Sequence, residues 1–146
     1  MPDYLVDLML WLSGAKAEVV GACLATQRFA VETEDSAALL LSLGGKGIGM
    51  IDTSAALASP GSRIEVYGAG GWIRGDDTLT GEGVIVTHRG EEQRFAPIDS
   101  LETYLAEVVD FARAIAGGPS IGADGEVAAE NVRILEQARA RGVRLA

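Results

Sequence analysis

The sequence has 146 residues, of which 48% are hydrophobic, and we expect one domain (1-146) with a substantial core. Its formal net charge of -9 argues against nucleic acid and anionic membrane surfaces as partners. The single cysteine, Cys23, cannot form an internal disulfide, and its apolar surroundings predict a buried free thiol, as is usual in a reducing cytoplasm. No basic segment opens the chain, and Asp7 interrupts the apolar stretch 5–12, so we predict neither a signal peptide nor a membrane span.

The first predicted element is a helix at the start of the chain. Pro2 suits the first positions of a helix, and the charge of Asp3 complements the positive end of its dipole. Apolar residues recur at the helical spacing of three and four, namely Leu5, Leu8, Met9 and Leu12. We expect this helix to end at Gly14.

A series of short segments rich in Val, Leu and Ile follows and predicts strands. Their ranges are 17–25, 36–43, 46–54, 63–67, 72–74, 84–88 and 93–96. Gly44-Gly45 suits a two-residue hairpin turn, and residues 89–92 would connect the last two strands. The short connections predict antiparallel pairing.

Two further helices are predicted towards the end of the chain. The first begins with the capping-box pattern of residues 99–102 and ends at Gly117-Gly118-Pro119. Its apolar face contains Tyr104, Val108, Phe111 and Ile115. The second runs from about Asp124 to Arg141, with Gly142 as its C-cap, and a last edge strand covers 143–145. Its inward residues are expected to be Val127, Ala128, Val132, Leu135 and Ala138.

This order of elements predicts an α+β fold: an open, mostly antiparallel sheet with helices packed on one face. The strands carry apolar residues on both sides, as in Leu39, Leu40 and Leu41. One layer of helices covers only one of these sides. We therefore expect the open sheet face to form a homodimer by packing on a second copy.

Neither glycine-rich stretch predicts a nucleotide site. Residues 67–73 have Ile73 in place of the third glycine of a G-x-G-x-x-G fingerprint, and a strand follows instead of a helix. Residues 44–47 lack the other residues of a P-loop. Both are predicted to form turns. His88, the only histidine, is expected at a solvent-facing strand end, so we predict no metal ligands.

Two groups of carboxylates are candidates for chemistry. Glu32, Glu34 and Asp35 could serve acid–base chemistry, although their place beside a strand start favours a solvated loop. Asp3 and Asp7 lie four residues apart, on one helical face, and could hold the hydroxyls of a polyol. The alternative is that Asp3 complements the helix dipole and Asp7 is exposed, and both readings stay open.

The chain resembles the C-terminal domain of the Gfo/Idh/MocA oxidoreductases, which include glucose-fructose oxidoreductase and inositol dehydrogenase. The residues that carry the resemblance are 7–14, 31–40, 64–71, 104–112 and 141–145, so it covers almost the whole chain. Met1 falls in mid-pattern, and we expect that the nucleotide-binding domain that precedes this domain in the family is missing.

The resemblance implies a substrate site at the start of the first helix. Family members carry a histidine three residues before the aspartate that aligns with Asp7, and a lysine from the nucleotide-binding domain assists while hydride passes to a nicotinamide. Tyr4 occupies the histidine position here. A phenol can donate a hydrogen bond but cannot replace imidazole near neutral pH without help. We expect Tyr4 and Asp7 to bind substrate, and we predict no catalytic, cofactor-binding or metal residues.

The implied function is that of a stand-alone substrate-binding and dimerisation domain, cytoplasmic and not catalytic by itself. It would belong to an NAD(P)-dependent oxidoreductase acting on a sugar, a polyol or a related small molecule, and would bind no cofactor alone. One alternative is a split enzyme completed in trans by a Rossmann-domain partner that docks on the first helix. The other is a non-redox module that binds a small molecule or a protein. Whether the chain has enzyme activity stays open.

Overall fold

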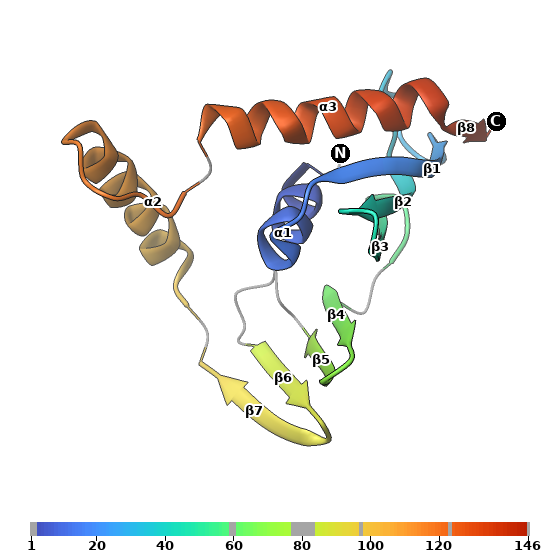
Figure 1. Ribbon diagram of the computed structural model, residues 1–146. Helices are drawn as coiled ribbons and strands as arrows, with labels where there is room; N and C mark the ends of the chain where they lie inside the picture. The colour runs from blue at the N-terminus through green and yellow to red at the C-terminus, as the bar shows by residue number, and fades with distance from the viewer. Residues whose placement is uncertain (1–2, 59–60, 77–83, 97, 123, 146) are drawn as a thin grey trace. The chain divides into compact units, whose positions relative to one another are not determined.

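The computed structural model describes residues 3–58, 61–76, 84–96, 98–122 and 124–145. They divide into two compact units (Figure 1). The first unit combines residues 1–58 with 123–146, and the second unit is 59–122. In the part of the chain described, no helix is long and apolar enough to cross a membrane.

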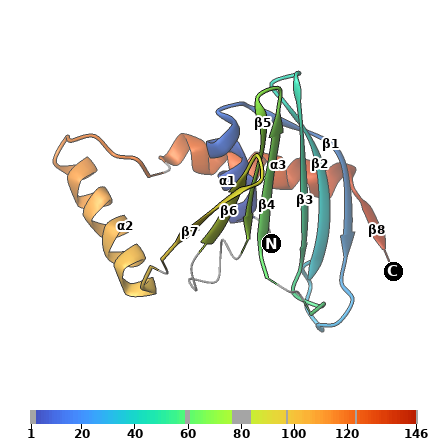
Figure 2. The ribbon, with the colours of Figure 1, turned by 90° about the horizontal axis from the view of Figure 1, so that it is seen from below.

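The first unit is a four-stranded sheet with two helices on one face. Its helices are α1 (Asp3–Ser13) and α3 (Gly125–Arg141). Its strands are β1 (Ala17–Ala25), β2 (Ser36–Leu43), β3 (Gly47–Ser54) and β8 (Val143–Leu145). The strand order is β3-β2-β1-β8 (Figure 2). The first three strands are antiparallel, and β8 lies at the edge, as expected, where it pairs with β1 in parallel.

The core of the first unit lies between the helices and the sheet. Alternate residues of β2 point inward, so Leu39 and Leu41 are buried while Leu40 is on the opposite face. The core is completed by Val6, Ala17, Val19, Leu24, Ala37, Ile51, Ile134 and Ala138. The opposite face exposes Val20, Ile48 and Met50. The expectation that both faces of these strands are apolar is therefore confirmed.

The buried face of α3 agrees with the sequence prediction only in part. Ala138 is buried and Leu135 packs against the core, as predicted, but Ile134 is also buried, whereas Val127 and Val132 are 38% and 55% exposed. Val132 lies on the far side of the helix from Ile134, because two residues turn an α-helix by about 200°. The contact with β1 sets the rotation of α3, and local apolar spacing alone did not determine it.

Gly142 ends α3 as predicted. Glycine is not required here by a left-handed backbone conformation. Its φ of -74° is available to any residue. A Cβ at this position would lie 2.5 Å from the carbonyl oxygen of Ala138 and 3.0 Å from the Cβ of Ala22. Glycine is needed because the chain passes this close to its own helix and to β1.

The second unit contains an antiparallel meander and one helix. Its strands, in the order β4-β5-β6-β7, are β4 (Arg63–Gly68), β5 (Gly71–Asp76), β6 (Val84–His88) and β7 (Glu91–Phe95). The helix is α2 (Ser100–Ile115), whose N-cap Asp99 accepts a hydrogen bond from the N–H of Leu101 at 2.7 Å. The expected apolar face of α2 is exposed, with Tyr104 and Phe111 both at 67%.

The α+β fold class, with mostly antiparallel strands, is confirmed, and the strands form two sheets. Both glycine-rich stretches are hairpin turns, as predicted, since Leu43 pairs with Gly47 and Gly68 pairs with Gly71. The first of these turns is one residue longer than expected.

Two further details of the prediction were wrong. The turn before β7 contains only Arg89 and Gly90, because both residues adopt positive φ angles of 52° and 88°, which suit a tight hairpin. Cys23 is partly exposed rather than buried. His88 is exposed at the end of β6, as expected.

Candidate functional site

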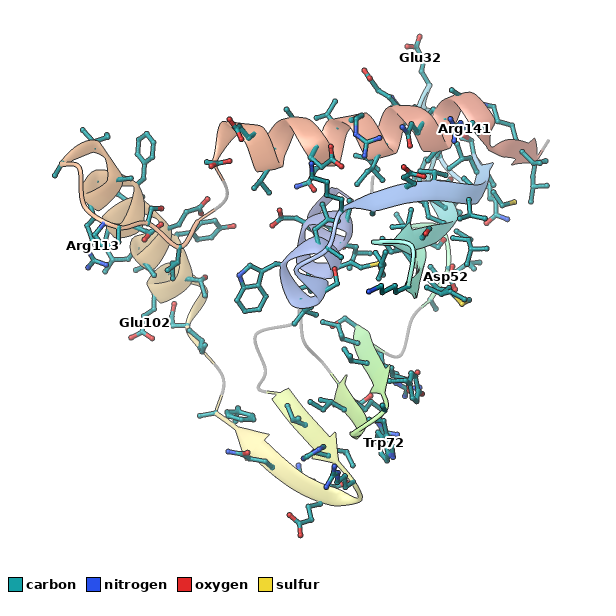
Figure 3. All side chains as sticks on the ribbon, in the orientation of Figure 1. Glu32, Asp52, Trp72, Glu102, Arg113 and Arg141 are labelled. Carbon is teal, nitrogen blue, oxygen red and sulfur yellow. The ribbon has the colours of Figure 1, made fainter. Side chains whose placement is uncertain are left out.

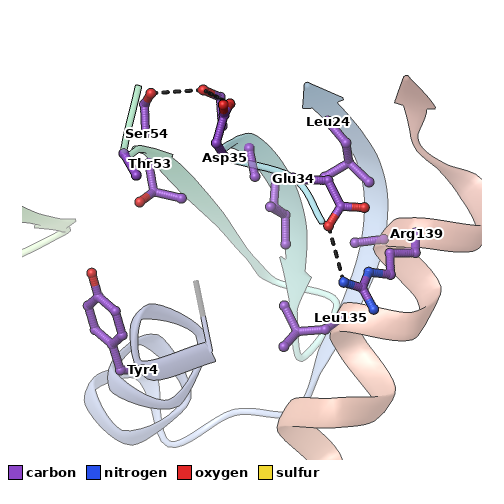
Figure 4. A pocket seen from close by; sticks show the side chains of 13 residues that line it. Tyr4, Leu24, Glu34, Asp35, Thr53, Ser54, Leu135 and Arg139 are labelled. Carbon is purple, nitrogen blue, oxygen red and sulfur yellow. Dashed lines mark hydrogen bonds and ion pairs between the residues drawn. The ribbon is translucent and has the colours of Figure 1, made fainter. Parts of the chain in front are cut away.

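A cavity of about 230 Å³ lies in the first unit, between the start of α1, the start of β2, the end of β3 and the last turns of α3 (Figure 4). Leu24, Leu39 and Leu135 form its apolar wall. Its polar lining comes from Tyr4, Glu34, Asp35, Ser36, Thr53, Ser54 and Arg139. Apolar walls with a few convergent polar groups are typical of small-molecule sites.

Asp35 fixes the loop between β1 and β2. Its carboxylate accepts hydrogen bonds from the backbone N–H groups of Gln27, Arg28 and Phe29 at 2.8–3.1 Å. The N–H groups of Arg28 and Gln27 contribute most to lowering the pKa of Asp35 to about 2. Asp35 therefore stays ionised near neutral pH and most of its acceptor capacity is used, so it is not suited to act as a general base.

Glu34 joins the loop to the C-terminal part of the chain. Its side chain is only 4% exposed and accepts hydrogen bonds from Arg139 at 3.1 Å and Arg144 at 2.9 Å. Burial by itself raises the pKa of Glu34, but its own backbone N–H and the two arginines outweigh burial, so the pKa lies below its usual value. Glu34 and its two arginines together carry one net positive charge, which the ionised Asp35 next to Glu34 in the chain offsets.

Two serine hydroxyls meet at the rim where β2 pairs with β3. The Oγ atoms of Ser36 and Ser54 are 2.8 Å apart. Ser54 Oγ already accepts from the N–H groups of Ala56 and Leu57, so its own proton is directed to Ser36. Ser36 in turn donates toward Asp35 or Gln27, both at 3.1 Å. The hydroxyl pair is thereby engaged within the protein.

Of the two predicted binding residues, the structure places one in the lining of the cavity and the other outside it. Tyr4 lines the cavity and is 53% exposed. Asp7 is outside the lining, and its Oδ1 accepts a hydrogen bond of 2.8 Å from Asn131 on α3. The side chain of Asp3 lies outside the described part of the structure. Of the proposed pair, only Tyr4 therefore faces the cavity.

The solvated-loop interpretation of the acidic cluster was wrong for two of its three members. Glu34 and Asp35 are buried, while Glu32 is exposed and points away from the sheet (Figure 3). The arginines that pair with Glu34 follow it by more than 100 residues, so no local pattern could indicate them. Within the described residues, no three metal-ligating side chains come together.

Residues 3–74 match the family described as the GFO/IDH/MocA C-terminal domain. Solved structures with a similar fold include KijD10, a 3-ketoreductase from Actinomadura kijaniata in complex with TDP-benzene and NADP. It has a TM-score of 0.71 and 16% sequence identity to this chain, and the alignment covers 100% of this chain and 48% of KijD10. UDP-N-acetylglucosamine 3-dehydrogenase GnnA from Acidithiobacillus ferrooxidans has a TM-score of 0.73 and 22% sequence identity. Its alignment covers 96% of this chain and 45% of GnnA. No curated protein matches the sequence.

These comparisons confirm the resemblance found in the sequence. At such identities the solved structures establish the shared fold alone. The chain spans just under half the length of these structures.

Proposed function

Because this chain belongs to the Gfo/Idh/MocA family as a C-terminal domain, we propose that it is the substrate-binding and dimerisation domain of an NAD(P)-dependent oxidoreductase. The substrate would be a sugar, a polyol or a related small molecule. The observation that supports this proposal is the cavity at the start of α1, lined by Tyr4. The name of GnnA, a UDP-N-acetylglucosamine 3-dehydrogenase, agrees with this substrate class.

Tyr4 is proposed to contact the ligand directly, since its phenol can donate a hydrogen bond to a substrate hydroxyl or carbonyl. Thr53 offers a further hydroxyl in the cavity. Asp7 lies three residues after Tyr4, on the same side of α1. Its Oδ2 receives no hydrogen bond among the described residues, so we propose that it meets a ligand that extends along the helix.

We propose that the chain does not catalyse hydride transfer alone. The sequence has no glycine-rich loop leading into a helix that could cradle a dinucleotide, and tyrosine replaces the family's histidine at position 4. The cofactor and the lysine would come from a nucleotide-binding domain, either in the same polypeptide or in a partner subunit. This chain would hold and orient the substrate.

Ligand titration by calorimetry or NMR tests the binding role. We expect the chain to bind monosaccharides or polyols, and Tyr4→Phe to weaken that binding about 3- to 10-fold, the effect of one neutral hydrogen bond. Tyr104→Phe, on exposed α2, is the matched control and should change nothing. Saturable NADPH binding by the chain, or equal effects of the two variants, would contradict the proposal.

The dimerisation role is proposed for the open face of the first sheet. Val20, Leu40, Ile48 and Met50 expose between 38% and 79% of their surfaces there. Together they amount to several hundred Å² of apolar surface, roughly the size at which patches mark interfaces. The same face of a second copy would match it, as in an isologous dimer. Leu40 and Met50 are register partners at its centre.

Light scattering at micromolar concentration tests this role. We expect twice the mass of the chain, and we expect Met50→Lys to give monomer because a lysine would be buried without a partner. Val132→Lys, on the exposed side of α3, is the control and should remain dimeric. A wild-type monomer would refute the proposed dimer.

A further inference from the structure

We propose that Arg139 makes the cavity selective for ligands that carry a carboxylate, so that its preferred occupant is a sugar acid rather than a neutral sugar. This inference rests on the proposed function, since it concerns the same cavity. It adds a specificity-determining residue that sequence analysis did not single out.

The first argument is the hydrogen-bonding capacity that the cavity has left. Asp35 is occupied by three backbone N–H groups, and Ser54 accepts two more and donates to Ser36. Arg139, in contrast, uses one of its nitrogens on Glu34, and a guanidinium carries five N–H donors. The unused polar capacity beside Arg139 therefore consists mainly of donors. A ligand that fits must bring acceptors to this place.

The second argument is that Arg139 is both positioned and accessible. It reaches from α3 to Glu34, which is 4% exposed and is also held by Arg144 (Figure 4). The side chain of Arg139 is itself 42% exposed. A guanidinium with one edge held by a buried carboxylate can present another edge to a ligand without losing much side-chain entropy. A carboxylate matches that planar edge with two parallel hydrogen bonds.

The charge and the volume of the site further restrict which ligands fit the cavity. The ionised groups in and beside the cavity are Glu34, Asp35, Arg139 and Arg144, whose charges cancel. A ligand with one negative charge therefore suits the site better than a phosphate monoester with two charges. A volume of about 230 Å³ corresponds to roughly eight waters. That space matches a single hexose ring with its substituents and is too small to enclose a whole nucleotide. A hexuronic acid meets both conditions.

The test compares ligands that differ only at carbon 6: glucose with glucuronate, and galactose with galacturonate. Binding is measured by calorimetry on the whole chain at neutral pH. We expect at least one acid to bind about tenfold or more tightly than its neutral partner. Arg139→Lys should lower the affinity for the acid about tenfold and leave the affinity for the neutral sugar unchanged. Lysine keeps the positive charge but lacks the planar pair of N–H donors that matches a carboxylate.

Control variants separate this effect from general loss of structure. Arg141→Lys, on the same helix and directed to the Val19 carbonyl, should leave the preference unchanged. Glu34→Gln, which changes the residue that positions Arg139, should lower the ratio of acid to neutral affinity as well as stability. Melting curves of each variant confirm that it is folded.

Each other outcome overturns a definite statement. Equal affinity for the acid and its neutral partner, or an unchanged preference in Arg139→Lys, refutes the role of Arg139 while the binding role stands. Tighter binding of glucose 6-phosphate than of glucuronate assigns Arg139 to a phosphate and refutes the carboxylate. If none of these ligands binds, the proposed function fails and this inference fails with it.

Discussion

The ion pairs of the buried Glu34 give the sharpest prediction about stability. Glu34→Gln keeps the size of the side chain but replaces one carboxylate oxygen by an NH₂ group, which faces an arginine instead of accepting from it. The two hydrogen bonds of 3.1 and 2.9 Å link the loop to α3 and β8, the last two elements of the chain. Their loss should therefore be felt in global unfolding.

The magnitude follows from the number and exposure of the contacts. A hydrogen bond to a charged group contributes about 1.5–3 kcal/mol when it is well shielded. The arginine side chains are 42% and 60% exposed, so solvent screens part of this contribution. We expect Glu34→Gln to lower the free energy of unfolding by about 1–3 kcal/mol. The corresponding fall in melting temperature is roughly 3–10 °C.

Thermal and urea unfolding at pH 7 measure this effect, with Glu32→Gln as the matched control. Glu32 is an exposed carboxylate of the same loop, and its substitution removes the same formal charge, so it should change stability by no more than about 0.5 kcal/mol. A double-mutant cycle with Arg144→Gln should show favourable coupling. If Glu34→Gln is no more destabilising than Glu32→Gln, the proposed contribution of the ion pairs of Glu34 is wrong.

The pH dependence of this effect has a definite sign. The pKa of Glu34 is lower in the folded chain than its ordinary value of 4.5. The ionised carboxylate therefore stabilises the fold fully above about pH 4.5, and this stabilisation is lost as the pH falls through the lower folded pKa. The difference between wild type and Glu34→Gln should accordingly be constant near neutral pH and shrink in acid.

Three other substitutions test further parts of the fold. The pKa of Asp35 is about 2 in the folded chain, against an ordinary value of 3.8, so Asp35→Asn should destabilise the chain at neutral pH. The difference in unfolding free energy between this variant and wild type should vanish as the pH falls from about 4 towards 2. Acid titrations followed by circular dichroism measure it. Ile134→Ala should cost about 2–5 kcal/mol in urea unfolding, because this side chain is fully buried, whereas exposed Val132→Ala should cost less than about 1 kcal/mol. Gly142→Ala should lower the melting temperature through the 2.5 Å contact with a backbone carbonyl, while Gly125→Ala, whose Cβ would meet nothing within 4 Å, should not; equal behaviour of the two would contradict the close-approach argument.

The sequence by itself determined the elements whose signals are local. Apolar spacing predicted α1, segments rich in Val, Leu and Ile predicted β1 and β2 within their observed bounds, and Gly44-Gly45 marked the hairpin after β2. The position of Gly142 at the end of α3 was also predictable. These features depend on residues a few positions apart, and local preferences of the backbone and side chains are enough to specify them.

The tertiary structure alone decided which strands share a sheet, which side of α3 is buried, and what becomes of the acidic loop. The position of Tyr4 at the start of α1 was predictable from the sequence. Its position in the lining of a cavity that α3 also lines was not. Glu34 and Asp35 read as solvated residues because nothing near them in the sequence neutralises a charge. The arginines that neutralise Glu34 come from the C-terminal end of the chain, and Asp35 depends on backbone N–H groups that converge only when the loop is folded. A buried charge is stable only with its partners in place, and those partners are brought together by the fold.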